Sequence, residues 1–143
     1  MNKEIRGGRT GDRESTGQQA KNTGIRDHKD LLVWQKAMSL TQLVYELNGR
    51  FPAEEKFGLV LQMHRAAVSV PSNIAEGQAR RTTGEFIQFI SHAEGSPAEL
   101  DTQTRLSVEL SFCGPLEAKA VLASVTEVRK ILTGLRRKLH PNP

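Results

Sequence analysis

The sequence predicts an all-α fold, an up-down-up-down antiparallel four-helix bundle with a disordered N-terminal tail. Three observations carry this prediction: four segments with helical spacing of apolar residues, short links rich in Gly and Pro, and no segment with the alternation of a β-strand. Long helices joined by short loops pack antiparallel to their neighbours. A chain of 143 residues suits a single core.

The first 27 residues contain little that a core would bury. Five glycines stand among charged and polar residues there, and Ile5 and Ile25 are the main apolar side chains. Burial on that scale does not offset the entropy lost on ordering. We therefore expect a disordered basic tail over residues 1–27 and one bundle domain over residues 28–140. A flexible extension and an arm that binds nucleic acid both stay open for the tail.

The first two helices follow from apolar residues that recur every three or four positions. Val33, Ala37, Leu40 and their successors predict a helix over residues 30–48, which Asn48-Gly49 ends. A second pattern predicts a helix over residues 53–80 that Pro52 opens. Its apolar residues are Val60, Met63, Ala67, Val70 and Ile74, with Phe57, Leu61, His64 and Val68 beside them.

The last two helices have clear boundary signals. Thr82 and Glu85 have the spacing of a capping box, so the third helix should begin near Thr83. Gly114-Pro115 ends it, with Gly95-Ser96-Pro97 as an internal weak point. The fourth helix follows, with valines and leucines at heptad-like spacing from Val121 to Leu139.

Pro71 lies inside the second helical pattern. Proline lacks an amide hydrogen, and its ring crowds the carbonyl four residues earlier, so we expect a kink there. Asn73 and Glu76 would then bond to backbone groups that the kink frees. Glu76 and Arg80 are also spaced for an ion pair on a solvated face.

Basic residues gather where the bundle brings two helix ends together. The net charge is +4 with a pI near 9.5, which permits an acidic partner. Cations at helix C-termini also complement the helix dipole, and that reading stays open. Because aromatic residues are sparse there, any nucleic acid would be recognised by its shape and backbone. The candidate nucleic-acid-binding residues are Arg80, Arg81, Arg129, Lys130, Arg136, Arg137 and Lys138.

No catalytic residue, metal site or cofactor is predicted, so we expect a protein that is not an enzyme. No His follows a Glu at the spacing that di-iron bundles use, and Cys113 has no second thiol. Arg136 and His140 are the nearest approach to the Arg-to-His arrangement of some helical ribonucleases. A chain without an apolar run of about 20 residues should not enter a membrane, and a single cysteine suits the cytoplasm.

Several ordered motifs resemble one bacterial family over residues 28 to 139. They are LLVWQKA, FPAEEKFGL, RAAVSVPSNIAEG, GEFIQF and GSPAEL, and they resemble the four-helix-bundle proteins encoded in intervening sequences of 23S ribosomal RNA genes. Pro97 departs from the family pattern, where an ordinary helix former is expected. The signature residues to which we assign structure and assembly are Arg65, Ser69, Pro71, Asn73, Glu76 and Gly77.

The resemblance implies a homopentameric ring without demonstrated catalysis. A related branch resembles accessory proteins of diversity-generating retroelements, which bind a reverse transcriptase and nucleic acid through a basic surface. Two hypotheses follow. The first is a homo-oligomeric bundle that binds RNA or DNA through a basic rim. The alternative is an adaptor that docks a reverse transcriptase or another protein without its own affinity for nucleic acid.

Overall fold

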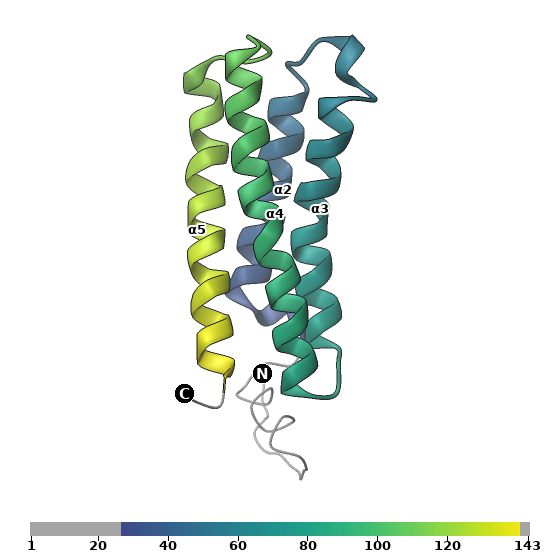
Figure 1. The fold of residues 1–143 in the computed structure, drawn as a ribbon, viewed down its shortest axis with the longest axis vertical. Coiled ribbons are helices and arrows are strands. Elements are labelled where there is room, and N and C mark those ends of the chain that lie inside the picture. The colour runs from purple at the N-terminus through teal and green to yellow at the C-terminus, as the bar shows by residue number, and fades with distance from the viewer. Residues whose placement is uncertain (1–26, 141–143) are drawn as a thin grey trace.

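A computed structural model describes residues 27–140, which form an antiparallel bundle of four long helices (Figure 1). The helices pack in a closed square, because each contacts the next in the chain and the last packs against the first. Short 3₁₀ turns, η1 (His28–Asp30) and η2 (Ala53–Glu55), precede the first two helices. The long helices are α2 (Leu32–Asn48), α3 (Leu59–Gln78), α4 (Thr83–Glu109) and α5 (Pro115–Leu139).

The predicted fold class is confirmed, and the described residues contain no strand. Apart from Asp27, the tail predicted over residues 1–27 lies outside the described residues. The arrangement of the four helices fixes how far apart the two predicted basic clusters lie. The ends of α3 and α5 lie at the same end of the bundle as the starts of α2 and α4, but α3 and α5 occupy diagonally opposite corners.

The core draws apolar residues from all four helices. Leu40, Met63, Ile90 and Val125 are among the side chains with no exposed surface, one from each helix. The predicted inward face of α2 is buried along its whole length, from Val33 to Leu47. Periodic apolar spacing therefore identified the inward face of α2, whereas Phe57 and Val68 of the second pattern expose 81% and 42% of their surface.

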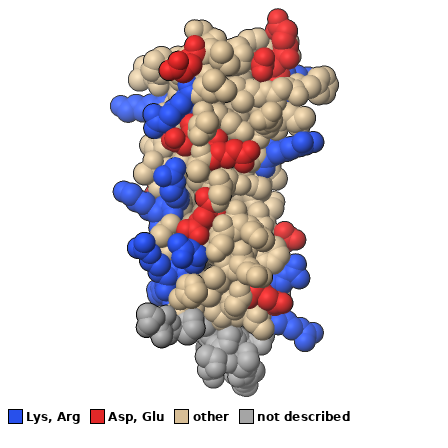
Figure 2. Space-filling view, viewed as in Figure 1, with Lys and Arg blue, Asp and Glu red and all other residues tan. Residues whose placement is uncertain are grey.

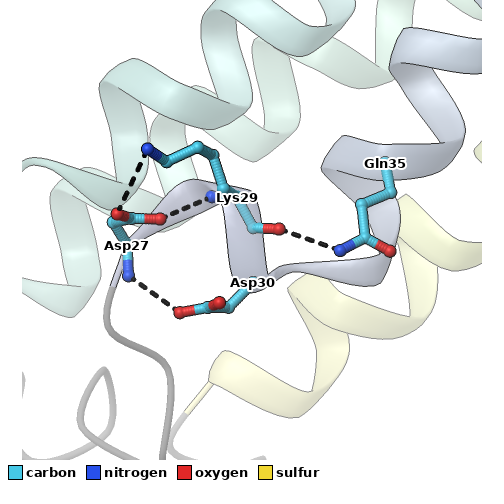
Figure 3. A network of polar contacts seen from close by, with 4 residues as sticks. All are labelled: Asp27, Lys29, Asp30 and Gln35. Atoms are coloured by element: carbon cyan, nitrogen blue, oxygen red, sulfur yellow. Dashed lines mark hydrogen bonds and ion pairs between the residues drawn. The ribbon is translucent and has the colours of Figure 1, made fainter.

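The chain enters α2 through η1, so the helix begins at Leu32 and not at residue 30. The Asp27 carboxylate accepts a hydrogen bond from the Lys29 amide at 2.8 Å, and the Asp27 amide donates to the Asp30 carboxylate at 3.3 Å. Gln35 then donates its side-chain amide to the Lys29 carbonyl at 2.8 Å (Figure 3). These bonds cap a separate short turn ahead of the helix.

The helix α3 begins at Leu59, six residues later than predicted. Residues 53–55 form the 3₁₀ turn η2, and the turn continues to Gly58, whose φ of −106° and ψ of −112° lie outside the helical region. The Glu55 carboxylate accepts from the Leu59 amide at 3.2 Å. A side chain from this preceding turn therefore bonds the first amide of α3.

Within α3 the chain stays helical through Pro71, which is buried. The proline leaves the Ala67 carbonyl without its usual donor, and the Thr41 hydroxyl of α2 lies 3.2 Å from that oxygen. Asn73 donates to the Ser69 carbonyl instead, at 2.8 Å, and Glu76 is exposed. The prediction that Asn73 and Glu76 bond the freed carbonyl was therefore wrong.

The helix α4 runs without a break through Pro97, so the weak point predicted there is absent. Its start agrees with the prediction, because the Thr82 hydroxyl accepts from the Glu85 amide at 3.1 Å. Its end comes at Glu109, before the predicted Gly114. Ser111 adopts a φ of 64°, and the amides of Ser111 and Phe112 donate to the carbonyls of Val108 and Ser107 at 3.0 and 2.9 Å. This pair of bonds is a Schellman motif.

Candidate nucleic-acid interface

The end of α5 carries most of the predicted interface. Arg129, Lys130, Arg137 and Lys138 are exposed, and none of them forms an ion pair with another described residue. Figure 2 shows Lys and Arg side chains gathered along the α5 edge of the molecule. A helix that buries Val125, Val128 and Leu132 turns its intervening positions to solvent, which places these cations outward.

Arg136 differs from its neighbours because α4 holds it. Its Nε donates to one Glu94 carboxylate oxygen at 2.7 Å and its Nη2 to the other at 3.4 Å, while the Thr133 hydroxyl donates to Glu94 at 2.8 Å. Burial raises the pKa of Glu94, but the bonds from Arg136 and Thr133 and the nearby charge of Arg137 outweigh it and leave that pKa below its ordinary value. Arg136 thus joins α4 to α5 and is less available to a ligand than the sequence suggests.

The second predicted cluster lies at the link between α3 and α4. Arg80 places its guanidinium 4.8 Å from the centre of the Phe89 ring, and Phe89 also packs against His92, with ring centres 6.0 Å apart. Arg81 is exposed. Because α3 and α5 are diagonal in the square, the Arg80–Arg81 cluster and the α5 cluster share one end of the bundle but not one corner.

The residues assigned to structure and assembly divide between two sides of α3. Ser69 and Gly77 face α4: the Ser69 hydroxyl bonds to that of Ser96, and a Cβ on Gly77 would lie 2.7 Å from the Phe89 Cβ. Asn73 bonds within α3, to the Ser69 carbonyl. Pro71 is buried beside α2, whereas Arg65 and Glu76 are exposed. Most of this motif therefore sets the packing of α3 within the chain.

An exposed apolar surface runs along the groove between α2 and α3, and we call it the α2–α3 seam. Met38, Tyr45 and Val68 expose 37%, 47% and 42% of their surface. The Tyr45 ring stacks on His64 with centres 3.7 Å apart, and His64 Nε2 is buried without a hydrogen-bond partner among the described residues. Burial lowers the pKa of His64. The seam consists of Trp34, Met38, Tyr45, His64, Val68 and Ala75.

Sequence reasoning missed the seam as an exposed surface. Apolar spacing marks Val68 and Met38 as part of a wide helical face, and spacing alone does not distinguish the part of that face that other helices cover. The signal that would have found it is the width of the apolar face on both helices, which exceeds what two neighbours in a four-helix square can bury.

Two further observations bear on chemistry. Over residues 27–140, no group of three or more His, Cys, Asp or Glu side chains is arranged to hold a metal ion. Arg136 and His140, the ribonuclease-like pair, lie at the end of α5 with Arg136 bound to Glu94 and His140 exposed.

No helix in the described part of the chain is both long and apolar enough to span a bilayer.

The fold and the site together define a small antiparallel four-helix-bundle protein with an exposed basic helix. The chain belongs to the 23S rRNA-intervening sequence protein family, whose model matches residues 29–134. The family that the motifs predicted is therefore confirmed.

A solved structure shares the fold. It is the crystal structure of a protein of unknown function from the S23 ribosomal protein family of Bacteroides thetaiotaomicron, with a TM-score of 0.69 and 20% sequence identity. The match covers 74% of this chain and 99% of that chain. At this identity the likeness concerns the fold alone. No curated protein matches the chain.

Proposed function

We propose that this chain is a non-enzymatic bundle protein that self-associates and binds RNA or DNA through cations at one end of the bundle. The observation that carries the proposal is the set of exposed cations on the last turns of α5 that have no ion-pair partner within residues 27–140: Arg129, Lys130, Arg137 and Lys138. Phosphate backbones bind such sets strongly because each contact releases condensed counterions. The Arg80–Arg81 cluster at the same end adds charge at a second corner.

Self-association is supported by the α2–α3 seam. Contiguous exposed apolar side chains on a soluble protein often mark an interaction surface, and Met38, Tyr45 and Val68 expose such surface on two neighbouring helices. A second copy of the chain is the occupant we propose, in line with the ring that the family resemblance implies. Repeated around a ring, the cations at one end would form a continuous basic rim.

The test is a titration of the purified protein into fluorescently labelled structured RNA and duplex DNA, followed by anisotropy at about 50 and 200 mM salt. We expect binding that weakens steeply with salt and that falls in the double variant Arg81→Glu/Arg137→Glu. The control Lys56→Glu/Arg105→Glu makes the same change in net charge at exposed positions outside the proposed interface. Absence of binding at the lower salt would contradict the proposal.

The same mixtures test the absence of catalysis. Labelled RNA incubated with the protein, with and without a divalent cation, should stay intact on a denaturing gel. Cleavage that disappears in Arg136→Ala or His140→Ala would contradict a purely binding role.

The adaptor role is the second candidate, and the α2–α3 seam is the observation that favours it. On that view the seam receives a reverse transcriptase or another protein, and the isolated chain has no affinity for nucleic acid. A monomeric protein that fails to bind RNA or DNA at low salt would favour the adaptor over our first proposal.

A further inference from the structure

The outward side of α5 carries a row of cations that extends well beyond the end of the bundle. Lys119, Lys130 and Arg137 are eleven and seven residues apart, which is about three and two helical turns, so they lie in one row. All are exposed, and Figure 2 shows basic side chains along much of this edge. We call the set the α5 flank; it consists of Lys119, Arg129, Lys130, Arg137 and Lys138.

The acids of α5 leave this flank uncompensated. Glu117 pairs with Arg50 of the link after α2 at 3.1 Å, and Glu127 pairs with Lys36 of α2 at 3.2 Å. Both acids of the helix are thus neutralised by cations from outside it. Among the described residues, no flank cation has an ion-pair partner.

The helix dipole does not account for the row. A cation complements the dipole only within about the last turn of a helix, and near the N-terminus it opposes the dipole. Lys119 lies in the second turn of α5, and Lys130 lies more than two turns before its end at Leu139. A ligand of opposite charge that runs along the helix explains these positions better than the dipole does.

The surroundings of the row indicate which polyanion fits. The helix α5 contains no aromatic residue, so unpaired bases would find no stacking platform there. Between the cations the exposed positions include Ala123 and Gly134, and no large apolar side chain is exposed on α5 after Leu116. Protein interfaces depend on aromatic or aliphatic anchors that this row lacks.

We infer that the α5 flank lies along the backbone of double-stranded nucleic acid. Residues 119 to 138 span about 28 Å of helix, which corresponds to roughly eight base pairs. The inference rests on the proposed nucleic-acid binding and moves its main contact from the end of the bundle to the side of α5. Phosphate contacts from this row fix the position of the duplex without reading its sequence.

The experiment compares two double variants of the full chain against duplex and single-stranded DNA of equal length. Lys119→Glu/Lys130→Glu changes the flank away from the bundle end, and Arg80→Glu/Arg81→Glu changes the opposite corner of that end. Lys56→Glu/Arg105→Glu is the control of matched charge at exposed positions outside the α5 flank, and circular dichroism verifies folding of each variant. We expect the flank variant to lose tenfold or more in duplex affinity and about 1.8 in the slope of log affinity against log salt. The corner and control variants should lose less than threefold.

The outcomes separate this inference from the function beneath it. If the wild-type protein binds no nucleic acid, both the proposed function and this inference are wrong. If the wild type binds but only the Arg80→Glu/Arg81→Glu variant loses affinity, the proposed nucleic-acid binding is supported and the assignment of the α5 flank as its main contact is wrong. Tighter binding to single strands than to duplex also overturns the inference. Displacement of the duplex by polyglutamate at equal charge overturns it too, because the flank would then be a site for acidic protein segments.

Discussion

At Gly77 the helices α3 and α4 approach so closely that only a hydrogen fits between them. An added Cβ would lie 2.7 Å from the Phe89 Cβ and 3.0 Å from a Phe86 ring carbon. We predict that Gly77→Ala lowers the free energy of unfolding by about 1–3 kcal/mol, because overpacking outweighs the helix propensity of alanine. The urea midpoint measures the change.

Gly134→Ala is the control for this prediction, since nothing lies within 4 Å of the added Cβ. It should raise the free energy of unfolding by about 0.5–1 kcal/mol, the ordinary gain for Gly to Ala inside a helix. If both variants are stabilised, the contact of α3 with α4 is looser than the structure describes.

The Glu94 carboxylate couples stability to pH. Its pKa is lower in the folded protein, so its ionised form contributes stability that is present above its unfolded pKa of about 4.3 and is lost as pH falls through the folded pKa. We predict that Glu94→Gln has a lower urea midpoint than the wild type at about pH 7, and that the two midpoints converge below about pH 4. Glu54→Gln, at an exposed position, should match the wild type throughout. A constant gap for Glu94→Gln would show that packing, not charge, sets its effect.

At the scale of elements, α2 stabilises α3 at its proline. The Thr41 hydroxyl lies 2.9 Å from the Ala37 carbonyl and 3.2 Å from the Ala67 carbonyl that Pro71 leaves without a donor. We predict that Thr41→Val costs about 1–3 kcal/mol in the wild type, because it leaves that buried carbonyl unsatisfied.

A double-mutant cycle isolates this bond. In the Pro71→Ala background the amide of residue 71 can reach the Ala67 carbonyl, so Thr41→Val should cost less by about 1 kcal/mol. The bond to Ala37 is the same in both backgrounds and cancels. Equal costs in the two backgrounds would mean that Thr41 does not serve the proline.

The end of α4 places a serine where glycine is usual. A residue other than glycine in the left-handed region costs about 1 kcal/mol or more, and Ser111 has a φ of 64° within the Schellman motif. We predict that Ser111→Gly raises the free energy of unfolding by roughly 1 kcal/mol, measured by urea denaturation. Ser91→Gly, at an exposed position inside α4, should lower it.

Particular residues show what the sequence could and could not predict about these elements. The apolar spacing from Val33 to Leu47 predicted the inward face of α2, and Thr82 predicted the start of α4. Both features depend on residues that are close together in the sequence. The partner of the Ala67 carbonyl and the pairing of Glu94 with Arg136 were not predictable, because each joins residues far apart in the chain. The same holds for the separation of the two basic clusters, which depends on how the helices are ordered around the square.

For the whole molecule, the apolar and basic surfaces lie on different sides. The α2–α3 seam and the α5 flank do not share a helix. The helix α3 is diagonal to α5, and although α2 packs against α5, the seam lies on the side of α2 that meets α3. Copies that associate through the seam would therefore leave the α5 flank of each copy open. Several flanks in one assembly would act together on a long polyanion and raise its affinity through effective concentration.

This arrangement yields a prediction about assembly. The variant Met38→Glu/Val68→Glu places two charges in the seam. Burial of these charges against a second copy would carry a desolvation penalty. The variant should therefore be monomeric in sedimentation velocity, with unchanged helical circular dichroism. Leu32→Glu/Leu116→Glu changes two exposed leucines outside the seam, which expose 56% and 81% of their surface, and should sediment as the wild type does. If the leucine variant dissociates and the seam variant does not, self-association uses another face. Affinity for a long duplex should fall in the seam variant as well, because a monomer presents only one α5 flank.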